Sequence, residues 1–201
     1  MTRLVVAAGA VAAWLALFAG AAAAGPGRAT ANPAAAEPVA PAAWFDAARD
    51  GDLAQLRKLA GPRPAALVDR ANADGYTALI LASYHDRRDT VAWLLRVHAS
   101  TCLTDARGYT ALMGAVFRGH TAIVEALARR PCGADFVTTA GQTPLMLAAL
   151  FGRTDIARSL LAAGADPRRR DAMSHDARSL AAGQGNDALV ALLDEAVRAR
   201  R

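Results

Sequence analysis

Large side chains are scarce in this chain of 201 residues. Aromatic residues make up only 5% of it, and the hydrophobic share of 54% comes largely from the 53 alanines in the printed sequence. This composition, with only 2 cysteines, excludes a disulfide-dense small protein, collagen and a polytopic membrane protein. The net charge of +5 is too modest for a nucleic-acid binder. The length favours one domain, alone or with extensions.

The residue patterns that accompany catalysis are also missing. The four histidines are His85, His98, His120 and His175. None of them has a partner three or four residues away, which is the spacing of two metal ligands on one helix. The chain has no Gly-x-Ser-x-Gly elbow and no glycine-rich phosphate loop ending in Lys-Ser or Lys-Thr. We therefore expect no enzymatic activity, no catalytic residues, no metal site and no cofactor.

Residues 1–24 predict an export signal. Arg3 precedes an apolar run over residues 4–19, and small residues follow up to Ala24, which is the pattern of a secretory signal peptide cleaved after that residue. The alternative is an uncleaved anchor in the inner membrane that faces the periplasm, because residues 4–24 are just long enough to span a bilayer. The alanine-rich composition suggests a bacterium. We expect a periplasmic or secreted protein that does not insert into the membrane after cleavage.

Residues 25–43 predict a disordered, semi-extended linker. This segment holds four prolines and almost no large apolar side chain. It cannot bury enough surface to offset the entropy that is lost when a chain becomes ordered. The folded domain is therefore expected over residues 44–201.

The folded part repeats with a period of 33 residues. Five columns of identical or similar residues keep this spacing, and they begin at Gly75, Thr77, Leu79, Ala82 and Leu94. The glycine permits the positive φ of a tight turn, and the threonine two residues later can cap the helix that follows. Apolar residues then recur at helical spacing. Each period thus predicts a turn, a short helix, a second turn, a second helix and a loop.

About five such units are expected, of which the first and the last are caps. Their residue ranges are 45–71, 72–104, 105–137, 138–170 and 171–197. In the third unit the motif Gly133-Ala134-Asp135 falls two residues later than its counterpart in the next unit. This offset predicts either a longer second helix or a remodelled loop.

The repeated residues resemble those of ankyrin repeats. The stretch Gly141-Gln142-Thr143-Pro144-Leu145, with Ala148-Ala149 and Gly152 after it, is similar to the central signature of that family, and Gly164-Ala165-Asp166 is similar to its closing motif. The resemblance covers residues 45–197. It implies an all-α solenoid of stacked helix-turn-helix units with protruding β-turns.

Two features bear on how such a stack packs. Ile80, Met113 and Met146 occupy the place of the family's signature histidine, so its hydrogen bond to the capping threonine is missing. Short helices that stack closely need small side chains at their contacts. We therefore expect much of the alanine to be interface material.

The two cysteines leave two alternatives open. Cys102 falls in the loop leaving the second unit, and Cys132 falls in the loop leaving the third. An oxidising compartment favours a disulfide between them. Neighbouring helical layers lie roughly 10 Å apart, whereas a disulfide needs Cα atoms within roughly 7 Å. Either the displaced third loop closes this gap and a disulfide forms, or both residues are buried free thiols.

The resemblance also implies where a partner binds, namely the turn residues beside the glycine and the last exposed residues of the first helix. All three tyrosines and two of the five phenylalanines fall on such positions. The candidate partner-binding residues are Tyr76, Tyr84, His85, Tyr109, Phe117, Arg118, Gln142 and Phe151. Aromatic residues interleaved with arginine are typical of protein-binding hot spots. Tyr76 and Tyr109 are expected on protruding turns with little to pack against. For the column Tyr84, Phe117 and Leu150, the alternative is that these residues only cover the seam between first-helix layers.

The resemblance implies a non-enzymatic interaction module or scaffold. We expect a monomeric stack that binds a protein partner, not nucleic acid, through its concave face in the bacterial periplasm. Two alternatives are an immunity or inhibitor protein for a toxin or enzyme, and an accessory factor for an envelope stress or redox enzyme.

Overall fold

The computed structural model describes residues 41–200, so the predicted signal peptide and most of the predicted linker lie outside the described residues. Within this range ten α-helices form five consecutive pairs. They are α2 (Ala42–Asp50), α3 (Leu53–Ala60), α4 (Ala78–Tyr84), α5 (Arg88–Arg96), α6 (Ala111–Arg118), α7 (Thr121–Ala128), α8 (Pro144–Leu150), α9 (Thr154–Ala162), α10 (Ala177–Gly183) and α11 (Asp187–Arg198), with the 3₁₀-helix η2 (Pro64–Ala66) after α3.

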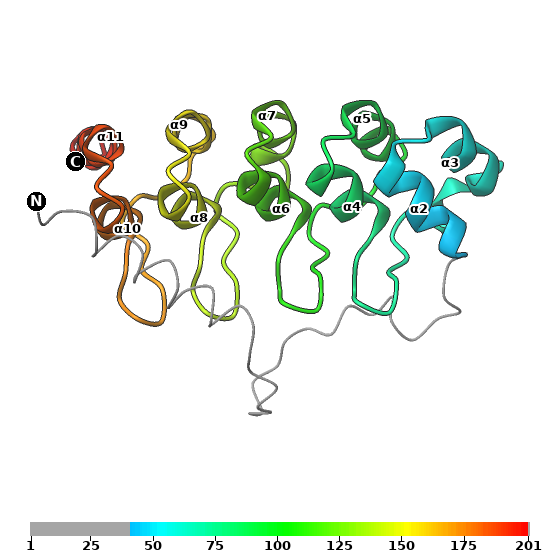
Figure 1. Ribbon diagram of the computed structural model, residues 1–201, viewed down its shortest axis with the longest axis horizontal. Coiled ribbons are helices and arrows are strands. Elements are labelled where there is room, and N and C mark those ends of the chain that lie inside the picture. Colours follow the sequence, from blue (N-terminus) through cyan, green and yellow to red (C-terminus); the bar gives the residue numbers. More distant parts are fainter. Residues whose placement is uncertain (1–40, 201) are drawn as a thin grey trace, which may run out of the picture.

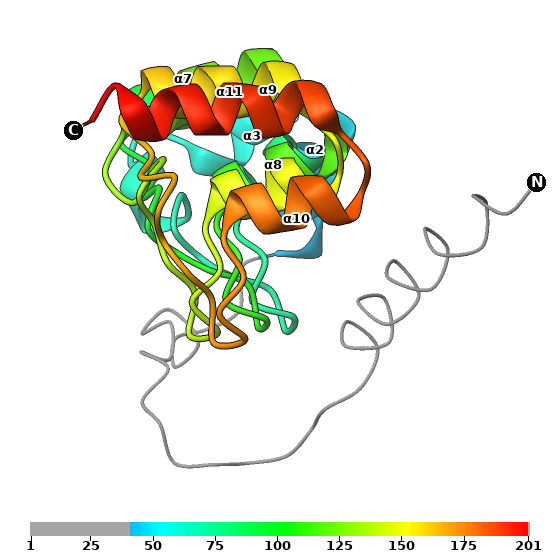
Figure 2. The ribbon, with the colours of Figure 1, turned by 90° about the vertical axis from the view of Figure 1, so that its left-hand side faces the viewer.

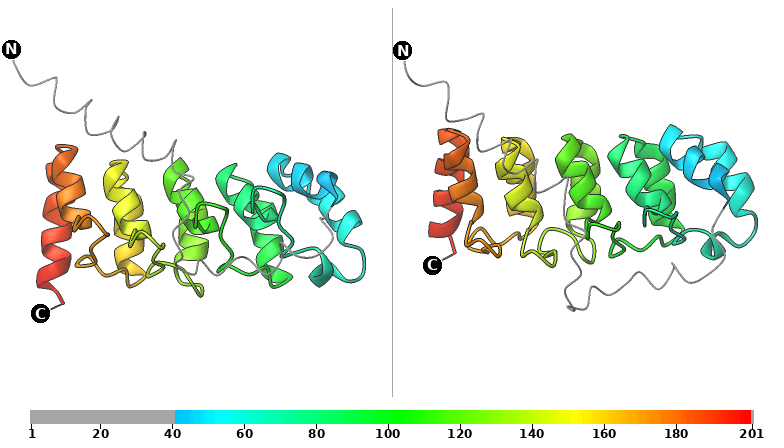
Figure 3. Two further views of the ribbon diagram at one scale, coloured as in Figure 1. Left: turned by 90° about the horizontal axis from the view of Figure 1, so that it is seen from below. Right: turned by 60° about the horizontal axis from the view of Figure 1, so that its bottom comes forward.

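The pairs stack side by side in chain order. Figure 1 shows the first helices α2, α4, α6, α8 and α10 in one row and the second helices in a row above them. Seen along the stack, the connections between pairs project together away from the helices (Figure 2). The views from below confirm that each pair follows its sequence neighbour (Figure 3). The predicted all-α solenoid is therefore the fold of the described residues, which hold no strand beyond the isolated bridges Ala71–Thr77 and Thr104–Thr110.

The first helix begins earlier than the sequence predicts. Helix α2 starts at Ala42, so the last two residues of the predicted linker belong to the folded domain. The Trp44 amide donates to the Pro41 carbonyl at 2.8 Å, and Trp44 itself is fully buried. Alanine is the best helix former, so Ala42 and Ala43 join the first turn once this indole is anchored.

Each loop between pairs ends in a tight turn with one residue at positive φ. These residues are Gly75, Gly108, Gly141 and Ser174, with φ of 81°, 84°, 78° and 65°. At Gly75 a Cβ would also lie 2.8 Å from the Ala106 amide nitrogen, so the next turn approaches too closely for any side chain. The sequence prediction of a glycine turn is confirmed, and Ser174 shows that the last unit keeps it.

The predicted helix caps are also present. The hydroxyl groups of Thr77, Thr110 and Thr143 accept hydrogen bonds from backbone amides three residues later, at 3.3, 3.4 and 3.2 Å. Asp176 takes this place in the last unit and forms a capping box with Ser179. Each first helix from α4 onward therefore starts where the repeat places it.

Small residues fill the contacts between layers. The column Ala82, Ala115, Ala148 and Ala181 is 0% exposed throughout. The leucine column Leu94, Leu127, Leu160 and Leu193 is at most 1% exposed. Close-packed interiors tolerate little added volume. Alanine therefore sets how closely neighbouring first helices approach, as the composition predicts.

The late motif of the third unit reflects a remodelled loop. Helix α7 has eight residues, one fewer than α5 and α9, so the second helix is not longer. Beyond it the Ala134 amide donates to the Ala128 carbonyl at 2.9 Å, and Cys132 has a φ of 52°. Cys102 and Cys132 form a disulfide in the structure, with Cα atoms 5.1 Å apart. This loop thus brings its cysteine closer to the preceding layer than the spacing of helices would.

None of the described helices is long and apolar enough to cross a membrane.

Candidate functional site

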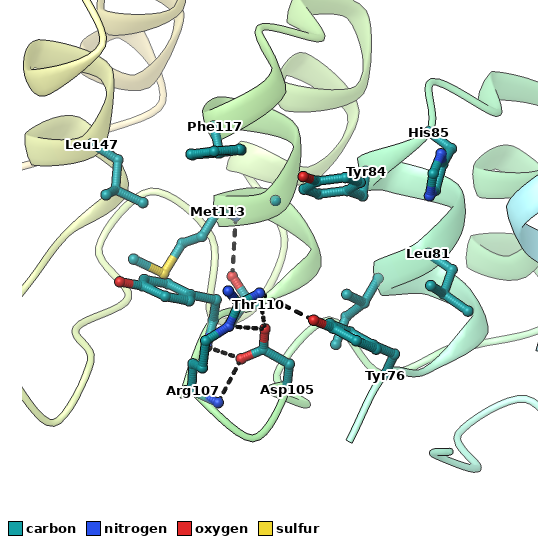
Figure 4. A pocket seen from close by; sticks show the side chains of 13 residues that line it. Tyr76, Leu81, Tyr84, His85, Asp105, Arg107, Thr110, Met113, Phe117 and Leu147 are labelled. Atoms are coloured by element: carbon teal, nitrogen blue, oxygen red, sulfur yellow. Dashed lines mark hydrogen bonds and ion pairs between the residues drawn. The ribbon is translucent and has the colours of Figure 1, made fainter. Parts of the chain in front are cut away.

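A groove of about 400 Å³ opens on the first helices of the three central units. It is lined by Tyr76, Ile80, Leu81, Tyr84, His85, Asp105, Arg107, Tyr109, Thr110, Met113, Gly114, Phe117 and Leu147. In Figure 4, Tyr84 and Phe117 form one wall, Tyr76 and Arg107 lie opposite, and Leu81 and Leu147 stand at the two ends. We call this feature the aromatic groove.

The structure brings the predicted partner-binding residues together. Five of the eight line the aromatic groove, namely Tyr76, Tyr84, His85, Tyr109 and Phe117. The remaining three each contact a lining residue: Arg118 lies over the Tyr84 ring, Gln142 bonds to Tyr109, and Phe151 packs on Phe117. The eight residues thus form one continuous surface across three layers.

Three aromatic rings form a ladder along the ends of the first helices. The rings of Tyr84 and Phe117 are stacked with centroids 6.1 Å apart, and Phe151 meets Phe117 edge-on at 4.9 Å. Each ring comes from a different layer and is half-buried. The rings therefore pack on one another across neighbouring layers, while Tyr84 and Phe117 also line the aromatic groove.

The two tyrosines of the turns are more buried and make more contacts than the sequence predicts. Tyr76 and Tyr109 are both half-buried and do not stand free on their turns. The Tyr76 hydroxyl accepts a hydrogen bond from Arg107 at 3.1 Å, and the Tyr109 hydroxyl donates to the Gln142 side chain at 2.9 Å. Burial raises the pKa of Tyr109. Each tyrosine thus joins its own turn to the turn of the next unit.

Asp105 organises the central turn, and the sequence interpretation missed it. Its carboxylate accepts the backbone amides of Arg107 and Tyr109, each at 2.9 Å, and also contacts the Arg107 guanidinium at 3.3 Å. Its side chain is only 4% exposed. The sequence does contain an indication of this role. The corresponding position of each unit, repeated every 33 residues, holds a residue with a side-chain acceptor, namely Asn72, Asp105, Thr138 and Asp171.

Gly114 is the second residue that the sequence interpretation missed. It lies inside α6 at a column whose other members are Leu81, Leu147 and Leu180. A Cβ on Gly114 would meet only the Tyr84 side chain, at 3.8 Å. Glycine inside a helix is less stable than alanine by about 1 kcal/mol. The missing side chain leaves the floor of the aromatic groove open. A glycine in a column that otherwise holds leucine is the sequence feature that could have predicted this opening.

Comparison with known families decides the identity of the stack. A family model described as ankyrin repeats in three copies matches residues 44–140, 98–171 and 119–199. The chain belongs to the ankyrin repeat family. Ankyrin repeats are in general protein–protein interaction modules and are typically not enzymes. No curated protein matches the chain.

The histidines of this ankyrin stack have separable roles. His120 precedes the first residue of α7, and its Nε2 lies 3.1 Å from the Tyr84 carbonyl oxygen, so it ties two layers together. His85 packs its ring against Tyr84 in the aromatic groove, with centroids 5.3 Å apart. Burial, assisted by the positive charges of Arg87, Arg118 and Arg49, lowers the pKa of His85. Of the two, His85 is the one that faces the groove.

The groove of the ankyrin stack offers ring faces, a methionine, hydroxyl groups and a guanidinium, which is the chemistry of a protein-binding surface. Among residues 41–200, no group of three or more His, Cys, Asp or Glu side chains is arranged to hold a metal ion.

Proposed function

We propose that this ankyrin protein is a monomeric, non-enzymatic adaptor that binds a protein partner through the aromatic groove in the bacterial periplasm. The observation that carries the proposal is the aromatic ladder with Arg118 stacked 5.1 Å above the Tyr84 ring centroid. Tyrosine, phenylalanine and arginine side chains of this kind are enriched in the cores of protein interfaces.

The aromatic groove is also held in place before a partner arrives. Asp105 fixes the central turn, and hydrogen bonds from Arg107 to Tyr76 and from Tyr109 to Gln142 join the neighbouring turns. A surface whose side chains are already ordered loses less entropy on binding. Modest contacts with a partner therefore suffice.

Two features support the proposed location. The first is the predicted signal peptide at residues 1–24. The second is the disulfide between Cys102 and Cys132, because disulfides persist in oxidising compartments such as the periplasm. Fusing residues 1–43 to a reporter that is active only after export tests this part, and the N-terminal sequence of the secreted product should begin at Gly25. An inactive reporter would overturn the location, and a product that starts at Met1 would favour the anchored alternative.

The binding surface is tested by Phe117→Ala combined with Arg118→Glu. Both side chains belong to the surface around the aromatic groove, and their loss should abolish retention of the partner in affinity purification from periplasmic extract. Arg158→Glu, an exposed change on the second helix α9, is the matched control and should retain the partner. Circular dichroism checks that all variants are folded. Equal recovery of the same protein by the double variant, the control variant and the unmodified chain would sink the proposal.

The captured protein also separates the adaptor from its alternatives. A tight one-to-one complex with a toxin or an enzyme, together with toxicity when this chain alone is deleted, would favour an immunity or inhibitor protein. A redox or stress enzyme that loses activity without this chain would favour an accessory factor.

A further inference from the structure

The aromatic groove contains one position, Gly114, that lacks a side chain, and we call the space above it the gap. Leu81 and Leu147 line the groove from the layers on either side of Gly114, which occupies the same column (Figure 4). Glycine weakens a helix relative to alanine, so nothing in the local structure of α6 favours it here. A Cβ at Gly114 would be in ordinary contact with Tyr84, at 3.8 Å. The fold therefore has room for a Cβ that the sequence does not supply.

The walls of this gap are suited to an aliphatic group. Met113 lines it from α6, and the rings of Tyr84 and Phe117 bound it on one side. The neighbouring layers show what such a space accepts, because Leu147 is buried at the corresponding position and Leu81 is half-buried. A branched aliphatic side chain from another chain would meet the same kinds of contact there.

One arginine beside the aromatic groove has no acidic partner. Arg107 is paired with Asp105 inside the groove. Arg118, in contrast, is exposed, lies over Tyr84 and has no carboxylate partner among residues 41–200. Burial is the largest cause of the lowered pKa of His85, the positive charges of Arg87, Arg118 and Arg49 add to it, and Asp50 opposes it, so Arg118 lies near this end of the groove. An acidic partner is complementary to such a surface.

We infer that the aromatic groove binds a short acidic segment of the partner protein, which inserts one leucine or isoleucine side chain over Gly114 and places a carboxylate on Arg118. This inference rests on the proposed function and adds to it the chemical class of the bound segment. The inserted side chain completes the leucine column across the three central layers.

Selection of peptides tests the inference without knowledge of the natural partner. The probe is a library of random 12-residue peptides displayed on phage, selected against the full chain purified after export. We expect the selected peptides to share one leucine or isoleucine beside aspartate or glutamate. Replacing that aliphatic residue by alanine should weaken binding roughly tenfold or more, because a buried leucine contributes that much to binding.

Two helical glycines give a matched pair of variants. Gly114→Leu fills the gap and should weaken binding of the selected peptide at least tenfold, whereas Gly183→Leu adds the same side chain to α10 where nothing lies within 4 Å and should leave binding unchanged. On Gly114→Leu, the change from leucine to alanine in the peptide should have little further effect. If Gly114→Leu does not fold, Gly114→Ala decides, since it should raise the melting temperature and still weaken binding.

The outcomes separate this inference from the proposed function. Peptides that bind Gly114→Leu as tightly as the unmodified chain but lose affinity for Arg118→Glu would overturn the inference and leave the groove as the binding surface. Peptides insensitive to both changes would contradict the proposed function as well. Enrichment of basic peptides, or no enrichment at all, would overturn the acidic aliphatic segment as the occupant.

Discussion

The second and third units are joined in different ways at two places. We call the loops that leave the two units the loop edge, and the β-turns beside the aromatic groove the turn edge. At the loop edge a covalent bond between Cys102 and Cys132 joins them. At the turn edge only noncovalent contacts do so, such as the backbone hydrogen bond from the Ala106 amide to the Asp74 carbonyl and the side-chain hydrogen bond from Arg107 to Tyr76, and beside them the aromatic groove stays open over Gly114. The disulfide that constrains the two units therefore lies away from the groove. The groove can therefore keep an unfilled position without loss of the relative placement of its two layers.

Removal of the disulfide should have the largest effect on stability. With a sequence separation of 30, Cys102→Ser combined with Cys132→Ser should lower the free energy of unfolding by about 3–4 kcal/mol, because the unfolded chain regains loop entropy. Urea unfolding followed by circular dichroism measures this. The unmodified chain in reductant is the control and should match the double variant. An unchanged midpoint would show that the disulfide adds no stability to the contact between the two units.

Asp105→Ala should have the next largest effect, and it acts on the turn edge. The change leaves two backbone amides and a guanidinium without their carboxylate acceptor, so the free energy of unfolding should fall by about 2 kcal/mol. Asp105→Asn is the control. Because Asn72 accepts the corresponding amides of the preceding turn, that variant should lose clearly less. Equal losses for both variants would contradict the proposed role of the side-chain acceptor.

Tyr109→Phe isolates a single contact at the turn edge. It removes the hydroxyl that donates to Gln142 and should cost about 0.5–1.5 kcal/mol in unfolding free energy. Tyr84→Phe serves as its control, because the Tyr84 hydroxyl makes no hydrogen bond within residues 41–200, and its effect should be smaller. A larger loss for Tyr84→Phe than for Tyr109→Phe would refute this assignment.

The smallest expected effect is on the titration of His85. Its pKa should lie below the ordinary value of about 6.5, and Arg118→Gln should raise it because one neighbouring positive charge is removed. In the unfolded chain His85 binds a proton more readily than in the folded one. The free energy of unfolding should therefore decrease as the pH falls from the ordinary pKa of histidine toward the lowered pKa of His85. Proton NMR of the imidazole measures the midpoint, with Arg158→Gln as control. A midpoint unmoved by Arg118→Gln would exclude its influence.

Features that recur with the repeat could be predicted from the sequence. The positive φ at Gly75 and the cap at Thr77 follow from residue type and position alone, so each is confirmed wherever the column continues. The start of α2 could not be placed as well, because alanine and proline occur both in the predicted linker and in the first turn. Only the buried Trp44 distinguishes them.

Features that depend on a neighbouring layer were harder to predict. The hydrogen bond from Tyr109 to Gln142 joins residues 33 apart, and its geometry depends on side-chain conformations that no local pattern specifies. The displaced Gly133 signalled a change but did not distinguish a longer helix from a new loop. The importance of Gly114 can be recognised only when its position is compared with the corresponding leucine positions of the neighbouring units.

The disulfide also affects the order in which parts of the stack open. In a solenoid each unit contacts only its neighbours, so local unfolding can begin at either end and spread inward. Cys102 and Cys132 link adjacent units near the middle, so the bond leaves the terminal helices free to fray while it resists separation of the central pair. Of residues 41–200, we therefore expect the region around Gly114 to exchange its amide protons last.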